Sequence, residues 1–235
     1  MRFLRNHSAW SSLAKGGVAT ALLFGVAALS FSWWALVLFV LALGVGYLKE
    51  PPRRRVVRVS FVFAAGCGVA GLALSIAVLP PAVAGWFIVA ILAAHWSLFA
   101  ILFFLAGTTN PRRDTFYGVA NTALLTSVYL LFFGLNESSL SSLSFVVQVA
   151  PLAVFLGTLL LVRETIAFEG TVWGRRTTVL AAAAALAAVE VSTILLFLPL
   201  GFVNAAILLS LVILLIRDGL IAHLGGIMDV RMILR

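Results

Sequence analysis

The chain has 235 residues, of which 63% are hydrophobic and only 10% are charged, and its mean hydropathy is +1.16. This composition excludes a water-soluble domain of ordinary type and predicts a polytopic membrane protein. In a soluble protein, the net charge of +8 would suggest nucleic-acid binding. In a membrane protein we assign it to orientation in the bilayer and to contact with anionic lipid headgroups, so no nucleic-acid partner is expected.

Eight apolar stretches are long enough to cross a bilayer, because a spanning helix needs about 20 residues and about 17 can suffice. In chain order they are 13–30, 31–48, 59–79, 82–106, 115–135, 144–162, 177–198 and 201–216. We therefore predict an all-α bundle of eight transmembrane helices, paired as four hairpins in one integral membrane domain over residues 1–235. Residues 217–235 mix apolar and charged side chains and are expected to form a cytoplasmic interfacial tail.

The first two spans form one uncharged run, residues 16–48. As a single helix this run would be about 50 Å long, whereas the hydrocarbon core is about 30 Å thick. We therefore expect two passes with a turn near Ser30. The alternative is a signal peptide, since basic residues precede an apolar run that ends in small residues at 28–30. Cleavage there would leave seven passes.

Positive charge alternates strictly between the segments that connect the spans. All 16 basic residues lie in alternate segments: Arg2, Arg5, Lys15; Lys49, Arg53, Arg54, Arg55, Arg58; Arg112, Arg113; Arg163, Arg175, Arg176; Arg217, Arg231, Arg235. By the positive-inside rule, both termini and all the basic loops are cytoplasmic. The same asymmetry favours the plasma (inner) membrane of a prokaryote.

The two halves of the chain show a possible internal repeat. Residues 17–23 resemble residues 118–125 after one insertion, and each stretch opens a hairpin. We interpret this as a 4+4 parallel repeat with units 1–111 and 112–216, related by an axis along the membrane normal. A chance match between apolar helices is the alternative.

Small and aromatic residues suggest how the helices pack. Small residues four apart in the third span, such as Ala64 and Gly68, and the alanine run at 181–185 predict closely packed central helices. The single cysteine, Cys67, is interpreted as a small packing residue. Trp96 is unusual because it lies in the middle of the fourth span instead of near an interface.

Two ionisable residues are expected inside the membrane. Glu190 lies in the seventh span and His95 near the centre of the fourth, and a carboxylate at that depth normally faces the bundle interior or a water cavity. Their depths are compatible with a hydrogen bond, so the pair could carry protons. Alternatively, each is neutral and satisfied by neighbouring groups. Further candidates for a proton or solute pathway, which could equally be interhelical hydrogen-bonding groups, are Asn121, Thr122, Tyr129, Gln148, Thr193 and Asn204.

The sequence contains no recognisable catalytic constellation, and no metal or cofactor is predicted. Only one histidine is embedded, because His7 and His223 lie near the ends of the chain, and the charges of the 163–176 loop are read as a solvated, partly paired surface. Three hypotheses follow. The first is a permease-like protein or membrane subunit that moves a small solute or proton. The second is a non-catalytic scaffold, assembly partner or homo-oligomer, and the third is an enzyme acting on a lipid. Candidates for contact with phosphate headgroups are Arg53, Arg54, Arg55, Arg175 and Arg176.

Overall fold

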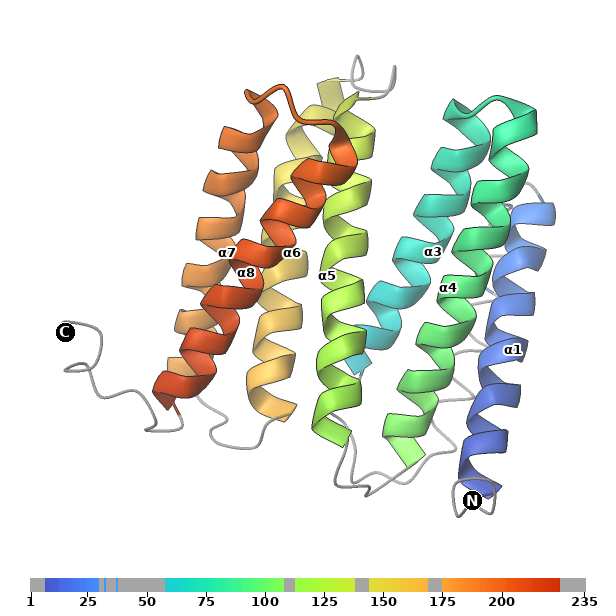
Figure 1. Cartoon of the computed structure of the whole chain (residues 1–235), viewed down its shortest axis with the longest axis horizontal. Helices are drawn as coiled ribbons and strands as arrows, with labels where there is room; N and C mark the ends of the chain where they lie inside the picture. The colour runs from blue at the N-terminus through green and yellow to red at the C-terminus, as the bar shows by residue number, and fades with distance from the viewer. Residues whose placement is uncertain are drawn as a thin grey trace. The chain divides into compact units, whose positions relative to one another are not determined.

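The computed structural model describes residues 7–29, 32, 37, 58–107, 113–137, 144–168 and 175–224. These residues form seven helices and no strand (Figure 1): α1 His7–Ala28, α3 Arg58–Val78, α4 Pro81–Gly107, α5 Arg113–Glu137, α6 Ser144–Phe168, α7 Arg175–Leu196 and α8 Phe202–Leu224. Each of the seven is long and apolar enough to cross a membrane. The chain is therefore an all-helical, multi-pass membrane protein.

The outward faces of these helices are as apolar as their packed faces. Trp86, Val62 and Leu215 are 78%, 71% and 75% exposed. Such side chains would be costly to leave in water, whereas lipid tails solvate them, so lipid contact explains helices that are apolar on every side.

The predicted second span, residues 31–48, lies outside the described residues except at 32 and 37. The eight-pass count and the alternative cleavage near residue 30 therefore stay predictions.

Helix α1 begins six residues before its predicted span, and two helices continue well past the C-terminal ends of theirs. Helix α6 continues past residue 162 to Phe168, and α8 continues past residue 216 to Leu224, into the segment expected to form the interfacial tail. Backbone hydrogen bonding does not depend on side-chain hydropathy, and long basic side chains can reach polar surroundings from within a helix. The extensions carry charged residues into the packed helices, notably Glu164 and Arg217.

The chain divides into two compact units, residues 1–124 and 125–235, and the division falls within α5. The proposed repeat has its boundary at 111/112 instead. The closest helix pair in unit 1 is α1 with α4, and in unit 2 it is α6 with α7. The internal repeat stays a prediction, and each unit is described by itself below.

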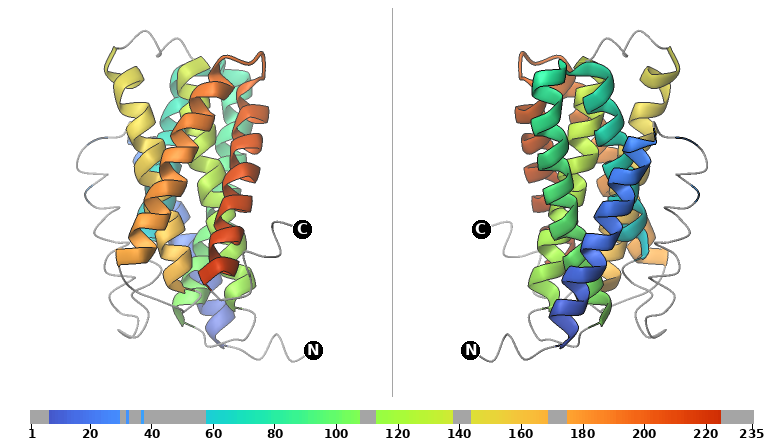
Figure 2. Two further views of the ribbon diagram at one scale, coloured as in Figure 1. Left: turned by 90° about the vertical axis from the view of Figure 1, so that its left-hand side faces the viewer. Right: turned by 90° about the vertical axis from the view of Figure 1, so that its right-hand side faces the viewer.

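In unit 1, α1 and α3 run in one direction and α4 packs against both in the opposite direction (Figures 1 and 2). A Cβ atom added to Gly16 of α1 would lie 2.8 Å from the backbone nitrogen of Ala100 on α4. On α3, Ala64 and Gly68 are buried, as their spacing predicts, but Gly66 is exposed and has no described atom within 4 Å of an added Cβ. The small residues thus let the helix backbones approach closely along one stripe of α3.

In unit 2, α7 packs against both α6 and α8. Its buried stripe recurs at helical spacing and consists mainly of alanines: Thr177, Ala181, Ala184, Ala185, Ala188, Ser192 and Leu195. The prediction that the alanine run is a packing surface is confirmed.

Candidate functional site

His95 lies on the buried face of α4 and is 7% exposed. Its Nδ1 is 2.8 Å from the carbonyl oxygen of Ile91, one turn earlier on the same helix. A carbonyl can only accept a hydrogen bond, so the contact assigns a hydrogen to Nδ1. The backbone of α4 therefore fixes both the orientation of the ring and its tautomer.

The other ring nitrogen faces α3. Nε2 of His95 is buried and has no hydrogen-bond partner among the residues that the structure describes. The ring fills the space above Gly68, where an added Cβ would lie 3.0 Å from Cδ2 and 3.1 Å from Nε2 of the histidine. The carbonyl oxygen of Ala64, one turn earlier on α3, lies beside the ring but outside hydrogen-bonding geometry for Nε2.

Helix α1 closes the third side of this junction. Leu23 is fully buried, and its Cδ2 would lie 2.7 Å from the same added Cβ of Gly68. Across the described parts of α1, α3 and α4 there is no acidic side chain. Their other ionisable side chains include Cys67, a buried free thiol on α3, and Lys15 of α1, whose Nζ lies 5.9 Å from the centre of the Phe103 ring. His95 thus sits in an apolar junction of three helices without a carboxylate.

Glu190 has a different environment. It belongs to unit 2, and its side chain is exposed on α7. Within unit 2, Glu190 does not lie on the packed face of α7, because Ala188 and Ser192, two residues before and after it, belong to the buried stripe. The expectation that it faces the bundle interior stays a prediction. The pairing of His95 with Glu190 would join the two units and stays a prediction.

The remaining pathway candidates do not form one cluster within a unit. Tyr129 of α5 is buried, and its hydroxyl is 2.8 Å from Oγ1 of Thr158 on α6. Asn121 is fully buried, whereas Thr193 and Asn204 are exposed. The hydroxyls of Thr122 and Thr193 donate to carbonyls of their own helices, at Gly118 and Val189. Gln148 belongs to α6, but its side chain is outside the described part of the structure.

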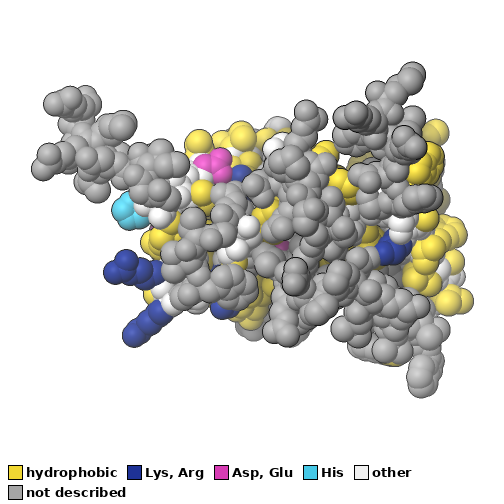
Figure 3. All heavy atoms as spheres, turned by 90° about the horizontal axis from the view of Figure 1, so that it is seen from below, with side chains coloured by type: hydrophobic (Ala, Val, Ile, Leu, Met, Phe, Trp, Pro, Cys, Tyr) yellow, Lys and Arg dark blue, Asp and Glu magenta, His cyan; other side chains and the backbone are white. Residues whose placement is uncertain are grey.

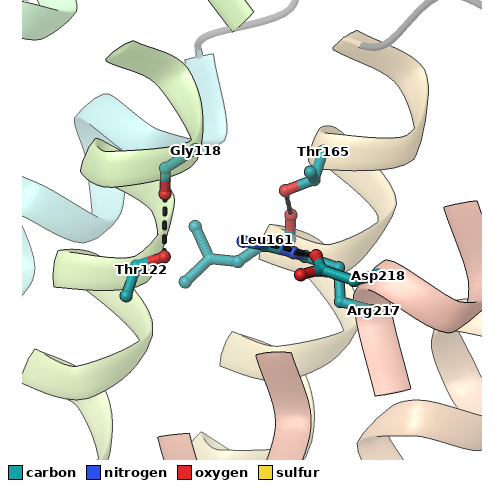
Figure 4. Close-up of polar contacts among 6 residues, drawn as sticks. All are labelled: Gly118, Thr122, Leu161, Thr165, Arg217 and Asp218. Atoms are coloured by element: carbon teal, nitrogen blue, oxygen red, sulfur yellow. Dashed lines mark hydrogen bonds and ion pairs between the residues drawn. The ribbon is translucent and has the colours of Figure 1, made fainter. Parts of the chain in front are cut away.

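Two buried charged residues in unit 2 were missed by the sequence analysis. Glu164 of α6 is 6% exposed and Arg217 of α8 is 9% exposed. The guanidinium of Arg217 donates from Nε and Nη2 to Oδ1 of Asp218 at 2.9 and 2.8 Å, and Thr165, beside Glu164, donates to the carbonyl of Leu161 (Figure 4). The interpretation of the 163–176 segment as a solvated surface is therefore wrong at Glu164.

A sequence signal for Arg217 did exist. The residue follows Ser210 and Ile213 at spacings of seven and four, and both are buried on α8. This helical periodicity places Arg217 on the packed face. Because hydropathy alone ended the predicted span at residue 216, the helical spacing of Arg217 from Ser210 and Ile213 was not considered.

Exposed basic side chains gather at one end of unit 2. Arg163 near the end of α6 and both Arg175 and Arg176 at the start of α7 are exposed. The space-filling view from below shows basic side chains, in dark blue, projecting there (Figure 3). The other headgroup candidates, residues 53–55, lie outside the described residues.

A shallow hollow of about 190 Å³ lies at the opposite end of unit 2. It is largely apolar and contains no predicted pathway residue; its lining is Phe133, Asn136, Leu195, Leu196, Leu198, Leu200, Phe202 and Ala205. Within the described parts of the chain, no three His, Cys, Asp or Glu residues are grouped so that they could hold a metal ion. The buried imidazole is the strongest candidate for chemistry.

Comparison with models of known families, with curated proteins and with solved structures finds no match to this chain.

Proposed function

We propose that the chain is a small permease-like protein, or a membrane subunit, that moves a small solute or proton across the plasma (inner) membrane and uses His95 as a proton-binding group. The observation that carries the proposal is the buried Nε2 of His95, which has no hydrogen-bond partner among the described residues. Leaving a buried polar atom unsatisfied costs about 1–3 kcal/mol. An ionisable group inside a membrane-spanning segment commonly marks an ion or proton pathway.

The proposed orientation has both termini in the cytoplasm. Within unit 2, the exposed residues Arg163, Arg175 and Arg176 lie where α6 ends and α7 begins. The positive-inside rule assigns such an end to the cytoplasm. We further propose that these three side chains contact anionic lipid headgroups, since each basic residue near such a surface contributes about 1 kcal/mol.

Glu190 enters the proposal as a second proton-binding group. Its exposed position on α7 leaves it accessible to a polar partner, such as a group of another subunit. A carboxylate in contact with lipid alone is costly, which supports the presence of such a partner.

The test is proton flux into proteoliposomes that contain a pH-sensitive dye, driven by a potassium diffusion potential. His95→Gln removes the titratable ring, and we expect flux to fall at least about tenfold, because a positioned acid–base group contributes about 10²–10⁴-fold. Ser97→Ala is the matched control, since Ser97 lies on the same helix, is exposed and donates to the carbonyl of Ala93. Glu190→Gln tests the second group.

A flux equal to that of empty liposomes, or one that His95→Gln leaves unchanged, contradicts the proposal. The circular dichroism spectrum and elution volume of each variant in detergent show whether it is folded. A non-catalytic scaffold would show no flux in any variant.

A further inference from the structure

We propose that the proton is taken up at Nε2 of His95 while Nδ1 keeps its own hydrogen, and that Gly68 is the positioning residue that lets the ring reach the Ala64 carbonyl. This inference rests on the proposed function and names the atom that would bind the proton. It follows from the polar groups on the two sides of the ring.

On the α4 side, Nδ1 of the ring donates a hydrogen bond to the backbone of its own helix. Nδ1 is 2.8 Å from the Ile91 carbonyl, which cannot donate, so Nδ1 carries a hydrogen in both the neutral and the protonated ring. In the neutral ring, Nε2 then has only a lone pair to offer. No described residue donates a hydrogen bond to it.

On the α3 side, the polar group beside the ring is another acceptor. The carbonyl oxygen of Ala64 lies beside the ring, and a backbone carbonyl has two lone pairs, so it can accept a second hydrogen bond in addition to the one within its helix. A lone pair on Nε2 gains nothing from this carbonyl. A hydrogen on Nε2 would have this acceptor beside it, and a small shift of the ring would bring the two into hydrogen-bonding geometry, so the protonated ring could donate from both nitrogens without flipping.

Gly68 creates the space that this arrangement needs. An added Cβ would lie 3.0 and 3.1 Å from Cδ2 and Nε2 of His95 and 2.7 Å from Cδ2 of Leu23. The Leu23 side chain would have to move, and the ring would have to shift by a few tenths of an ångström, which changes its position relative to the Ala64 carbonyl. Two residues earlier, a Cβ on Gly66 meets no described atom within 4 Å.

Leu23 of α1 covers the junction, because its side chain is fully buried against Gly68. Gly16, two turns earlier on α1, holds the backbones of α1 and α4 in contact at Ala100. A rotation of the Leu23 side chain therefore opens a route to Nε2 more readily than a movement of the whole helix.

Few other charges face this site. Cys67 is the ionisable side chain of α3 next to Gly68, and Lys15 of α1 lies at Phe103, about 12 Å along α4 from His95 at about 1.5 Å per residue. Helix α4 contributes no ionisable side chain other than His95. Because the described parts of α1, α3 and α4 contain no acid, the partners of the protonated ring in this junction are the two backbone carbonyls.

The experiment is ¹⁵N nuclear magnetic resonance of the full chain in lipid nanodiscs, with labelled histidine. The sequence has three histidines, so His7→Gln and His223→Gln leave His95 as the single source of signal. At high pH we expect a protonated Nδ1 and a non-protonated Nε2. On acidification, Nε2 should gain the hydrogen while the Nδ1 signal stays of the protonated type.

Gly68→Ala and Gly66→Ala are a matched pair on the same helix. We expect Gly68→Ala to change the Nε2 signal and to lower proton flux at least about tenfold, as expected for a displaced acid–base group, whereas Gly66→Ala leaves both unchanged. Leu23→Ala, which adds no atoms, should accelerate proton exchange at Nε2. This third variant keeps the inference testable if Gly68→Ala does not fold.

The inference is overturned if neutral His95 carries its hydrogen on Nε2, if Nε2 never titrates, or if the two glycine variants behave alike. A titrating Nε2 in a protein without flux would leave the inference standing and remove the proposed function. If His95→Gln abolishes flux but Nε2 is not the nitrogen that gains the proton, the proposed function stands and the inference is overturned.

Discussion

Replacing Gly16 by alanine is expected to force α1 away from α4. The added Cβ would lie 2.8, 3.0 and 3.1 Å from N, Cα and Cβ of Ala100. Favourable carbon contacts lie at about 3.5–4.0 Å. Because two of the three atoms belong to the backbone, no change of side-chain rotamer relieves the overlap, and the helices themselves must separate.

The cost can be estimated against a control on the same helix. Overpacking typically costs about 1–3 kcal/mol, and a clash with backbone belongs at the upper end. Gly→Ala in a helix contributes about 0.8–1.0 kcal/mol of favourable propensity. An added Cβ at Gly25 meets no described atom within 4 Å, so Gly25→Ala should change the free energy of unfolding only through the higher helix propensity of alanine. The difference in the free energy of unfolding between the two variants therefore measures the cost of overpacking alone, about 3 kcal/mol.

Thermal unfolding in detergent, followed by far-ultraviolet circular dichroism, measures this difference. In a chain of this size, 1 kcal/mol corresponds to about 2–4 °C in Tm, so Gly16→Ala should unfold about 6–12 °C below Gly25→Ala. If the two variants unfold within about 2 °C of each other, α1 and α4 do not cross in backbone contact. The packing described for unit 1 would then be wrong.

Three further variants test contacts in both units. Trp96→Phe removes the hydrogen bond from the indole nitrogen to the Leu13 carbonyl, 3.2 Å long, and should lower unfolding free energy by about 0.6 kcal/mol, a typical value for interhelical bonds in membranes; no loss means that the bond is not formed. A double-mutant cycle of Tyr129→Phe and Thr158→Val should give a coupling of about 0.6–1.7 kcal/mol, and additive effects argue against their hydrogen bond. Arg217→Ala should cost about 1–3 kcal/mol, as for a buried hydrogen-bonding group, and Asp218→Ala, at an exposed residue, less than about 1 kcal/mol. The reverse order in unfolding experiments would place the arginine outside the packed face.

Hydropathy predicted the helices well because it determines which segments can leave water. The spans predicted at 59–79 and 82–106 correspond to α3 Arg58–Val78 and α4 Pro81–Gly107. It failed at the polar ends of α6 and α8, where the helix continues because its backbone hydrogen bonds are independent of side-chain polarity. Boundaries drawn at charged residues therefore placed Glu164 and Arg217 outside the packed core.

The direction in which a side chain faces was harder to predict than its depth. Hydropathy placed both His95 and Glu190 inside spans, but only packing determines how each helix is rotated. On α7, the alanine stripe marks the packed face, and Glu190 lies away from it. Trp96 was unexplained because its partner is the backbone of a helix far away in sequence, at Leu13.

The two tight glycine contacts of unit 1 argue for a role of His95 beyond packing. At Gly16 the space is filled by the backbone at Ala100, which leaves no polar side chain unsatisfied, whereas at Gly68 it is filled by an imidazole. A leucine or phenylalanine would fill the second space without a buried, unpartnered nitrogen, which costs about 1–3 kcal/mol. Packing alone does not account for an imidazole at this position. The proposed reversible protonation would account for it, because only the protonated ring can donate to the Ile91 and Ala64 carbonyls at the same time.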